Sequence, residues 1–209
     1  MTIPRLYPIL DVGLLEDRGV SVVDAAQAMI DGGARILQWR CKAPISRGYF
    51  QQAERIAELC RKNAVLFIVN DRADIARLLD AGLHLGQDDL PPTPARDLIG
   101  PACLGLSTHN RDQLRAAGNE PIDYVALGPI FDTASKQNPG PTVGIENLRQ
   151  WRELARAPLV AIGGMERRKA REVIESGADS VAVIGDLLPA ESTMTSIRQR
   201  IEEWLTLIE

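Results

Sequence analysis

The sequence predicts a (β/α)8 barrel, an α/β fold in which eight parallel strands alternate with helices. Short apolar runs alternate with amphipathic segments along the 209 residues, which is the pattern of consecutive βαβ units. The apolar runs show no polar alternation, as expected of strands that are buried on both faces of a parallel sheet. Eight such units fit a closed barrel near the lower size limit of that fold.

The expected strands are short and end at polar or glycine residues. In chain order they cover residues 6–10, 36–39, 66–69, 83–85, 103–106, 124–127, 159–162 and 181–184. The rival fold is an open doubly wound sheet, whose first strand–helix turn usually carries a Gly-x-Gly-x-x-Gly fingerprint. Here that turn reads Asp11-Val12-Gly13, which favours the closed barrel, with residues 1–209 as one domain.

Helices are expected between the strands because apolar residues recur there at helical spacing. The first expected helix follows Ser21 and stops at Gly32-Gly33, and the second follows Ser46, a residue type that caps helices. Asn110 is the same kind of cap for a helix that ends at residue 117. The other helices are expected at residues 72–80, 94–99, 145–156, from the double glycine to residue 176, and around 197–208.

Composition excludes several classes of function. A net charge of −4 and the lack of a basic arm argue against nucleic acid binding. No apolar run approaches the roughly 20 residues that span a bilayer, so no membrane partner is expected. The three cysteines form no Cys-x-x-Cys pair, which indicates reduced thiols in a cytoplasmic enzyme. A homo-oligomer is compatible with this composition.

Cationic and amide side chains alternate at the end of the second expected strand. Gln38, Arg40 and Lys42 are two residues apart, so an extended backbone places them on one face. If that face is the barrel interior, they point toward the C-terminal end of the strands, where barrel enzymes bind substrates. The alternative is an exposed strand end, where cations are common.

Carboxylates follow the third and fourth expected strands. Asn70 and Asp71 come directly after one strand, and Asp88 and Asp89 follow the next. The ends of neighbouring parallel strands meet, so these groups are expected to form a carboxylate pair suited to Mg²⁺, which usually brings phosphates with it. Asp71 could instead cap the following helix, and spacing does not choose between Asp88 and Asp89.

The later strands end at groups that suit phosphate. Thr133, Ser135 and Lys136 offer two hydroxyls and a cation in the loop after the sixth strand, with a solvated loop as the alternative. Gly164 and Gly185 follow the seventh and eighth strands, where barrels commonly bind phosphate through backbone N–H groups.

Two histidines complete the candidates. His84 lies within a strand and is expected to be a hydrogen-bonded interior residue. His109 follows Ser107-Thr108 at a strand end, where a structural and a functional role are equally compatible with the sequence.

Several motifs together resemble one family, thiamine phosphate synthase. In order, they are QWRCK, FIVNDRADIARLLDAGLHLGQDDL, LGLSTH, DYVALGPIFDTASK, VAIGG and GADSVAVIG. Each motif is weak alone, but the ordered set is specific and covers nearly the whole chain. The resemblance implies a (β/α)8 barrel that joins 4-amino-5-hydroxymethyl-2-methylpyrimidine diphosphate to 4-methyl-5-(2-phosphoethyl)thiazole, with Mg²⁺ required. The products would be thiamine phosphate and diphosphate.

The resemblance also implies roles for individual residues. Asp71 and Asp89 would hold Mg²⁺, which selects Asp89 over Asp88. The implied contacts of the pyrimidine diphosphate are Gln38, Arg40, Lys42, Asn70, Ser107 and Lys136. The implied contacts of the thiazole phosphate are Thr133, Ser135, Gly164, Ile184 and Gly185. The implied catalytic residues are Arg40, Lys42, Lys136 and Ser107.

Two positions depart from the family pattern. Ser135 stands where the family usually has threonine, which keeps the hydroxyl. Gly185 stands where serine is frequent, so a side-chain contact is lost there while the N–H remains.

The resemblance implies that diphosphate leaves the pyrimidine methylene and that the thiazole nitrogen attacks the resulting carbocation. Cations would stabilise the leaving group, and no strong base is needed. One alternative is an isomerase similar to thiazole tautomerase, and the presence of His109 keeps this alternative open. The other is a non-catalytic phosphate-ligand-binding paralogue, against which the intact Asp71, Asp89 and Lys136 argue.

Overall fold

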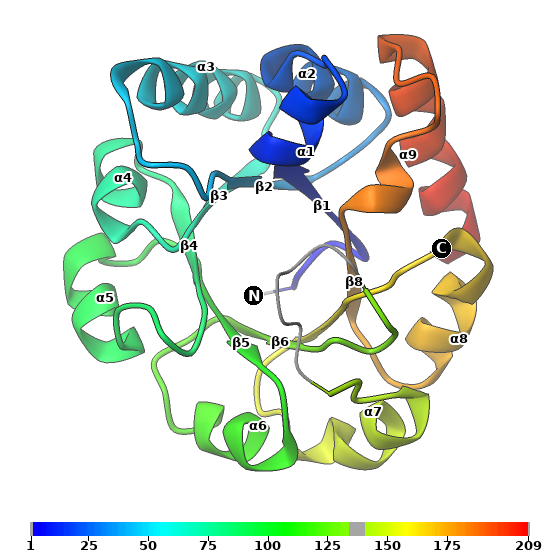
Figure 1. Cartoon of the computed structure of the whole chain (residues 1–209). Coiled ribbons are helices and arrows are strands. Elements are labelled where there is room, and N and C mark those ends of the chain that lie inside the picture. Colours follow the sequence, from blue (N-terminus) through cyan, green and yellow to red (C-terminus); the bar gives the residue numbers. More distant parts are fainter. Residues whose placement is uncertain (1, 134–140, 209) are drawn as a thin grey trace.

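The strands form a closed parallel barrel in sequence order, with helices around it (Figure 1). The computed structural model describes residues 2–133 and 141–208. The first strand pairs with both the second and the eighth, which closes the sheet. The strands are β1 (Leu6–Asp11), β2 (Ile36–Arg40), β3 (Leu66–Asn70), β4 (Gly82–Leu85), β5 (Leu104–Thr108), β6 (Tyr124–Leu127), β7 (Leu159–Ile162) and β8 (Ser180–Val183).

The helices cover the outside of this barrel (Figure 1). They are α1 (Val12–Asp17), α2 (Val22–Asp31), α3 (Arg47–Lys62), α4 (Ala73–Leu78), α5 (Pro92–Ile99), α6 (Arg111–Ala117), α7 (Ile145–Trp151), α8 (Ala170–Glu175) and α9 (Met194–Ile208). Short 3₁₀ segments add η1 (Arg152–Leu154), η2 (Arg167–Lys169) and η3 (Gly185–Leu187). The expected caps Ser21, Ser46 and Asn110 each accept a backbone N–H of the first turn of their helix.

Successive residues of each strand belong to two different apolar clusters. Leu6 and Leu10 of β1 pack outward in the large core between strands and helices. Tyr7 and Ile9 point the other way and pack inside the barrel with residues such as Ile68. This alternation follows from the two-residue period of side-chain direction along a strand. At the C-terminal end of each strand, every second side chain therefore points into the barrel mouth.

The structure confirms the barrel and changes several details. The helix expected from the double glycine to residue 176 begins only at Ala170, after the 3₁₀ segment η2. The short helix α1 was not expected, and it starts because the Asp11 side chain accepts the Leu14 N–H. The helix expected at 145–156 ends at Trp151 and continues only as the 3₁₀ segment η1. The fifth strand runs to Thr108, which pairs with β6.

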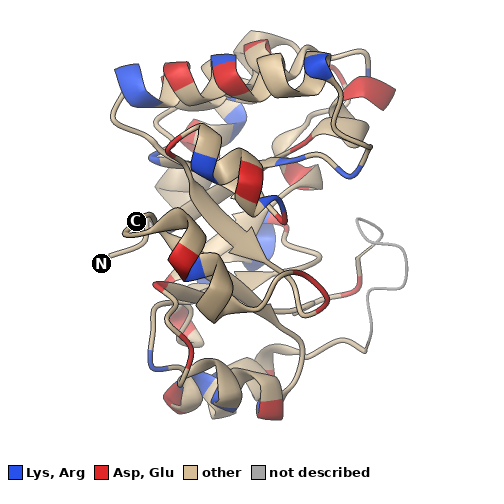
Figure 2. Ribbon diagram, turned by 90° about the vertical axis from the view of Figure 1, so that its left-hand side faces the viewer, with Lys and Arg blue, Asp and Glu red and all other residues tan. Residues whose placement is uncertain are grey.

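Charged residues of both signs are spread over the outer helices, while the strands carry few (Figure 2). Among residues 2–133 and 141–208, no helix is both long and apolar enough to span a bilayer.

Candidate active site

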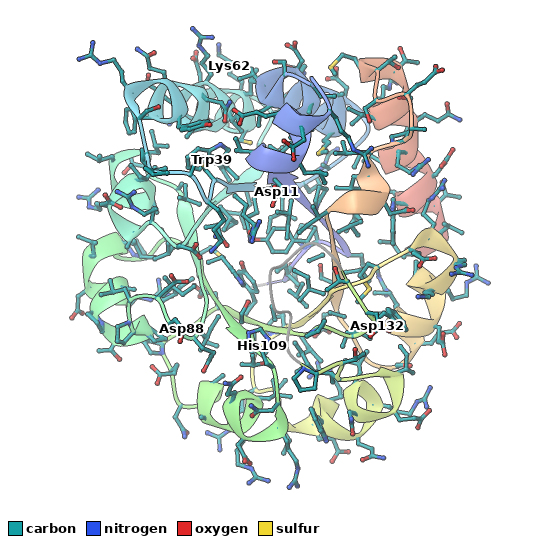
Figure 3. All side chains as sticks on the ribbon, in the orientation of Figure 1. Asp11, Trp39, Lys62, Asp88, His109 and Asp132 are labelled. Carbon is teal, nitrogen blue, oxygen red and sulfur yellow. The ribbon has the colours of Figure 1, made fainter. Side chains whose placement is uncertain are left out.

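Polar side chains gather at the C-terminal ends of the strands. Figure 3 labels Asp11 and His109 on opposite sides of the barrel opening, and Trp39 on the helix side of β2. The Trp39 indole N–H donates to the Gln52 side chain of α3 at 3.0 Å. Its neighbours Gln38 and Arg40 therefore face the barrel interior, as the period-two prediction requires.

Arg40 is held at the mouth by a carboxylate of the neighbouring strand. Asp11 and Arg40 are register partners in the β1–β2 ladder, and Arg40 Nη1 forms an ion pair with Asp11 Oδ2. The two side chains are only 14% and 13% exposed. Because one guanidinium carries five N–H donors, this pair leaves donors for a ligand.

Lys42 lies beyond the end of β2 and reaches the next strand. Its Nζ is 2.5 Å from Asp71 Oδ2. Asp71 has a φ of +63°, a left-handed conformation that aspartate tolerates better than most residues, and its N–H donates to the His84 carbonyl at 2.8 Å. The helix α4 has Arg72 at its N-cap position with no side-chain capping bond, so Asp71 does not cap it.

Asp89, and not Asp88, joins this group. The Asp89 carboxylate accepts the Gly86 N–H at 2.7 Å and lies near enough to Asp71 for the two carboxyl groups to interact. Burial, and next the contact with Asp71, raise the pKa of the Asp89 carboxyl above its ordinary value. Asp88 is exposed, and Figure 3 labels it away from the barrel opening.

This donor set fits a hard cation. Two close carboxylates repel each other when both are ionised, and oxygen ligands are those that Mg²⁺ prefers. Within residues 2–133 and 141–208, no group of three or more His, Cys, Asp or Glu side chains is placed to hold a metal. A cation bound by Asp71 and Asp89 would therefore take its remaining ligands from water and substrate.

A chain of hydrogen bonds crosses the barrel interior beneath the mouth. Gln38 Nε2 donates to Tyr7 Oη at 3.0 Å, and Tyr7 Oη lies 2.8 Å from Tyr124 Oη. His84 Nδ1 lies 2.8 Å from Tyr124 Oη, and His84 Nε2 lies 2.8 Å from Ser107 Oγ. The expectation that His84 is a hydrogen-bonded interior residue is confirmed.

Asn70 ends β3 beside this chain and is buried. Its Nδ2 finds no hydrogen-bond partner among the described residues. A buried amide donor without a partner carries a desolvation cost of about 1–3 kcal/mol, which a ligand acceptor would remove. The orphaned donor therefore points to a ligand beside β3.

A cavity of about 390 Å³ opens beside the ends of β6, β7 and β8. Gly164 has a φ of +61°, and a Cβ there would lie 2.4 Å from the Asp132 carbonyl oxygen, so the position requires glycine. Gly185 has open space around it within the part of the chain that the structure describes. The sequence candidates that line the cavity are Thr133, Gly164, Ile184 and Gly185. Ser135 and Lys136 lie outside the described residues.

His109 also lines this cavity, and its Nδ1 is 2.6 Å from the Gly128 carbonyl oxygen. A carbonyl oxygen can only accept, so Nδ1 carries a proton. When the ring is neutral, Nε2 is then an acceptor.

Comparisons with known proteins identify relatives of this chain. Residues 6–187 match the family model described as thiamine monophosphate synthase. The chain belongs to this family. The thiamine-phosphate synthase of Koribacter versatilis is 42% identical over 212 residues, covering 100% of this chain and 97% of the relative. The thiamine-phosphate synthase of Chloroflexus aurantiacus is 39% identical, covering 93% and 90%.

A solved structure extends the likeness to the fold. The thiamine phosphate pyrophosphorylase from Pyrococcus furiosus superposes with a TM-score of 0.85 at 31% identity, covering 98% of this chain and 95% of that chain. Membership of the thiamine monophosphate synthase family makes this chain a transferase that acts on small molecules.

Four structurally important residues of this thiamine monophosphate synthase family member were missed from the sequence. Asp11 was seen only as a strand end, and Tyr7 and Tyr124 only as strand residues. Asp186 lines the cavity and accepts hydrogen bonds from Arg167 Nε at 3.1 Å and Trp204 Nε1 at 2.9 Å. A tyrosine inside a parallel strand is a usable signal, because its hydroxyl needs a partner when buried.

Proposed function

We propose that this chain is a Mg²⁺-dependent thiamine phosphate synthase. It would join 4-amino-5-hydroxymethyl-2-methylpyrimidine diphosphate to 4-methyl-5-(2-phosphoethyl)thiazole, giving thiamine phosphate and diphosphate. The observation that carries the proposal is the meeting of two cations and two carboxylates, Arg40, Lys42, Asp71 and Asp89, at one side of the barrel mouth. A glycine-lined cavity lies at β7 and β8.

The charged side suits a diphosphate. Arg40 is preorganised by Asp11, and Lys42 is within 2.5 Å of Asp71, so both cations are in place before a ligand arrives. Asp71 and Asp89 would hold Mg²⁺, which would neutralise the diphosphate and stabilise it as a leaving group. Lys136, which lies outside the described residues, is proposed as a further diphosphate contact.

The interior suits the pyrimidine ring. Gln38, Asn70 and Ser107 are amide and hydroxyl groups at the bottom of the mouth, and all three are buried. They would bind the polar edge of the ring, and the orphaned Asn70 Nδ2 supports this placement.

The glycine-lined cavity suits the thiazole phosphate. Gly164 and Gly185 leave backbone N–H groups accessible, and Thr133 adds a hydroxyl at its edge. Ile184 contributes apolar lining. Ser135, outside the described residues, is proposed as a second hydroxyl contact.

The proposed reaction needs positioning more than proton transfer. The bond between the pyrimidine methylene carbon and the diphosphate oxygen breaks, and its electron pair leaves with the diphosphate. The thiazole nitrogen then donates its lone pair to the methylene carbon. Arg40 and Lys42 stabilise charge that grows on the leaving oxygens, and the barrel holds both substrates in line. A location in the cytoplasm stays a prediction.

A product assay tests this proposal. Purified protein with both substrates should form thiamine phosphate when Mg²⁺ is present and should lose this activity with a chelator. Turnover of a thiazole isomer without thiamine phosphate would instead favour the isomerase. Binding of the pyrimidine diphosphate and the thiazole phosphate with no turnover of either would favour a non-catalytic paralogue.

A further inference from the structure

The hydrogen-bond chain beneath the barrel mouth joins five side chains from five strands. Gln38, Tyr7, Tyr124, His84 and Ser107 lie in this order, with successive separations of 3.0, 2.8, 2.8 and 2.8 Å. All five are buried, with exposed fractions between 1% and 6%. Its two ends are residues proposed above to contact the pyrimidine ring.

The direction of donation along this chain follows from its first member. The Gln38 amide nitrogen can only donate, so Tyr7 Oη accepts there, and Tyr124 Oη at 2.8 Å is the acceptor within reach of the Tyr7 proton. Tyr124 has then accepted one bond, and its proton goes to His84 Nδ1. A neutral His84 ring with an acceptor at Nδ1 carries its proton on Nε2, which donates to Ser107 Oγ.

The tyrosine hydroxyls keep their protons throughout. Burial raises the pKa of Tyr7 and that of Tyr124 far above the ordinary range. Each therefore remains a hydroxyl with one proton to give, which is what a single direction of donation requires.

The packing around Tyr124 holds the hydrogen-bond chain in place. The Tyr124 ring stacks on His84 with centroids 5.5 Å apart, and it meets the Tyr7 ring edge-on at 5.8 Å. Gly105 is its register partner on β5, and a Cβ at Gly105 would lie 2.0 Å from Tyr124 Cζ. The missing side chain at Gly105 makes room for the ring, so the hydroxyl is directed at both neighbours.

We propose that this hydrogen-bond chain fixes the direction of donation from Gln38 to Ser107 and so makes Ser107 a hydrogen-bond donor toward the ligand. We call this arrangement the relay. Ser107 Oγ accepts from His84, so its own proton is directed at an acceptor in the mouth. The inference rests on the proposed function, in which that acceptor is a ring nitrogen of the pyrimidine. His84, Tyr124 and Tyr7 are then positioning residues, which act on the ligand through Ser107.

The opposite direction would give a different enzyme–ligand contact. If the Gln38 amide were rotated by half a turn, Tyr7 would donate to its oxygen, and every later bond would reverse. Ser107 would then donate to His84 and offer only a lone pair, which suits an amino group of the pyrimidine. The two directions differ in one observable, because His84 carries its proton on Nε2 in the first and on Nδ1 in the second.

The tautomer of His84 can be read by ¹⁵N NMR of the ligand-free protein at a pH where both rings are neutral. The chain has 2 histidines, so the spectrum holds two ring systems. His109 is an internal reference, since its Nδ1–H faces the Gly128 carbonyl and gives the opposite tautomer. A His109→Gln variant assigns the signals. The relay predicts Nε2–H for His84. A protonated Nδ1, whether as the other tautomer, the charged ring or an exchanging mixture, overturns it.

A double-mutant cycle tests whether Tyr124 acts through Ser107. Tyr124→Phe removes the hydroxyl and keeps the ring, and it should raise KM for the pyrimidine diphosphate roughly fivefold to tenfold with kcat changed less than about twofold. In a Ser107→Ala background the same change should have no effect on KM. Equal effects in both backgrounds would show a merely structural role and would overturn the relay.

Two controls keep the outcomes separate. Tyr49→Phe removes a hydroxyl that bonds Glu16 near the surface, and it should leave KM unchanged. If Tyr124→Phe does not fold, the tautomer measurement on the unaltered protein still decides. That measurement needs no activity, so a protein that makes no thiamine phosphate would sink the proposed function while leaving the direction of the relay measurable.

Discussion

Asp11 and Arg40 are register partners on adjacent strands, and their side chains form an ion pair at the barrel mouth. The same Asp11 carboxylate caps α1 by accepting the Leu14 N–H at 3.0 Å. One residue therefore ends a strand, starts a helix and orients a proposed diphosphate ligand. The pairing is partly shielded from water, so salt screens it less than it screens a surface ion pair.

Asp11→Asn should separate these roles. Asparagine is also a good N-cap, so α1 should keep its cap, while loss of the shielded ion pair should lower the free energy of unfolding by about 1–3 kcal/mol. Arg40 loses its charged partner, and KM for the pyrimidine diphosphate should rise roughly fivefold. Steady-state kinetics and urea unfolding check both parts, with Asp17→Asn, at an exposed position of α1, as the control. A lower KM would mean that Asp11 competes with the ligand for Arg40.

Asp89→Asn should reduce kcat far more than Asp88→Asn. Asp89 contacts Asp71 and accepts the Gly86 N–H, whereas Asp88 is exposed. Loss of a metal ligand is expected to lower kcat about 100-fold, or about 2.7 kcal/mol in the barrier, and to weaken Mg²⁺ binding. Asp88→Asn should stay within about twofold. Equal losses in titrations of activity against Mg²⁺ would place the metal elsewhere.

Gly164 and Gly185 should respond differently to a side chain. At Gly164 the φ of +61° and the nearby Asp132 carbonyl exclude a Cβ, so Gly164→Ala should destabilise the fold by about 1–3 kcal/mol and raise KM for the thiazole phosphate. A Cβ at Gly185 would meet no atom of the described residues within 4 Å, so Gly185→Ser should change stability by less than about 0.5 kcal/mol. Thermal unfolding and kinetics compare the pair. Equal destabilisation would contradict the assigned backbone geometry.

The buried cysteines should make the fold sensitive to alkali. Burial raises the pKa of Cys60 and that of Cys103 from 9.0 to about 12 in the folded protein. The stabilisation from a raised pKa is complete below pH 9 and is lost as the pH rises toward 12, because the unfolded thiols ionise first. Urea unfolding at pH 8 and pH 10 should show this loss. A Cys60→Ala variant should lose less between the two pH values, and an equal loss would exclude Cys60 as a cause.

The sequence by itself determined the barrel and most of its mouth. Apolar runs and helical periodicity encode burial locally, so the strands and most of the helices could be placed to within a few residues, while α1 was missed. The same alternation put Gln38 and Arg40 on the interior face, because side-chain direction along a strand has a fixed period. The ends of parallel strands meet at one side, which brought Asp71 and the Asp88-Asp89 pair together as candidates.

Only the tertiary structure decided which side chains touch. Tyr7 and Tyr124 are 117 residues apart and meet because closing the barrel brings β1 and β6, which are not neighbours in the sheet, together across its interior. Asp89 was separated from Asp88 by the turn in which it accepts the Gly86 N–H. Spacing along the chain records the direction of a side chain but not its distance from a partner on another strand. The partners Asp11–Arg40 and Asp186–Trp204 therefore required strand register and helix packing to be known.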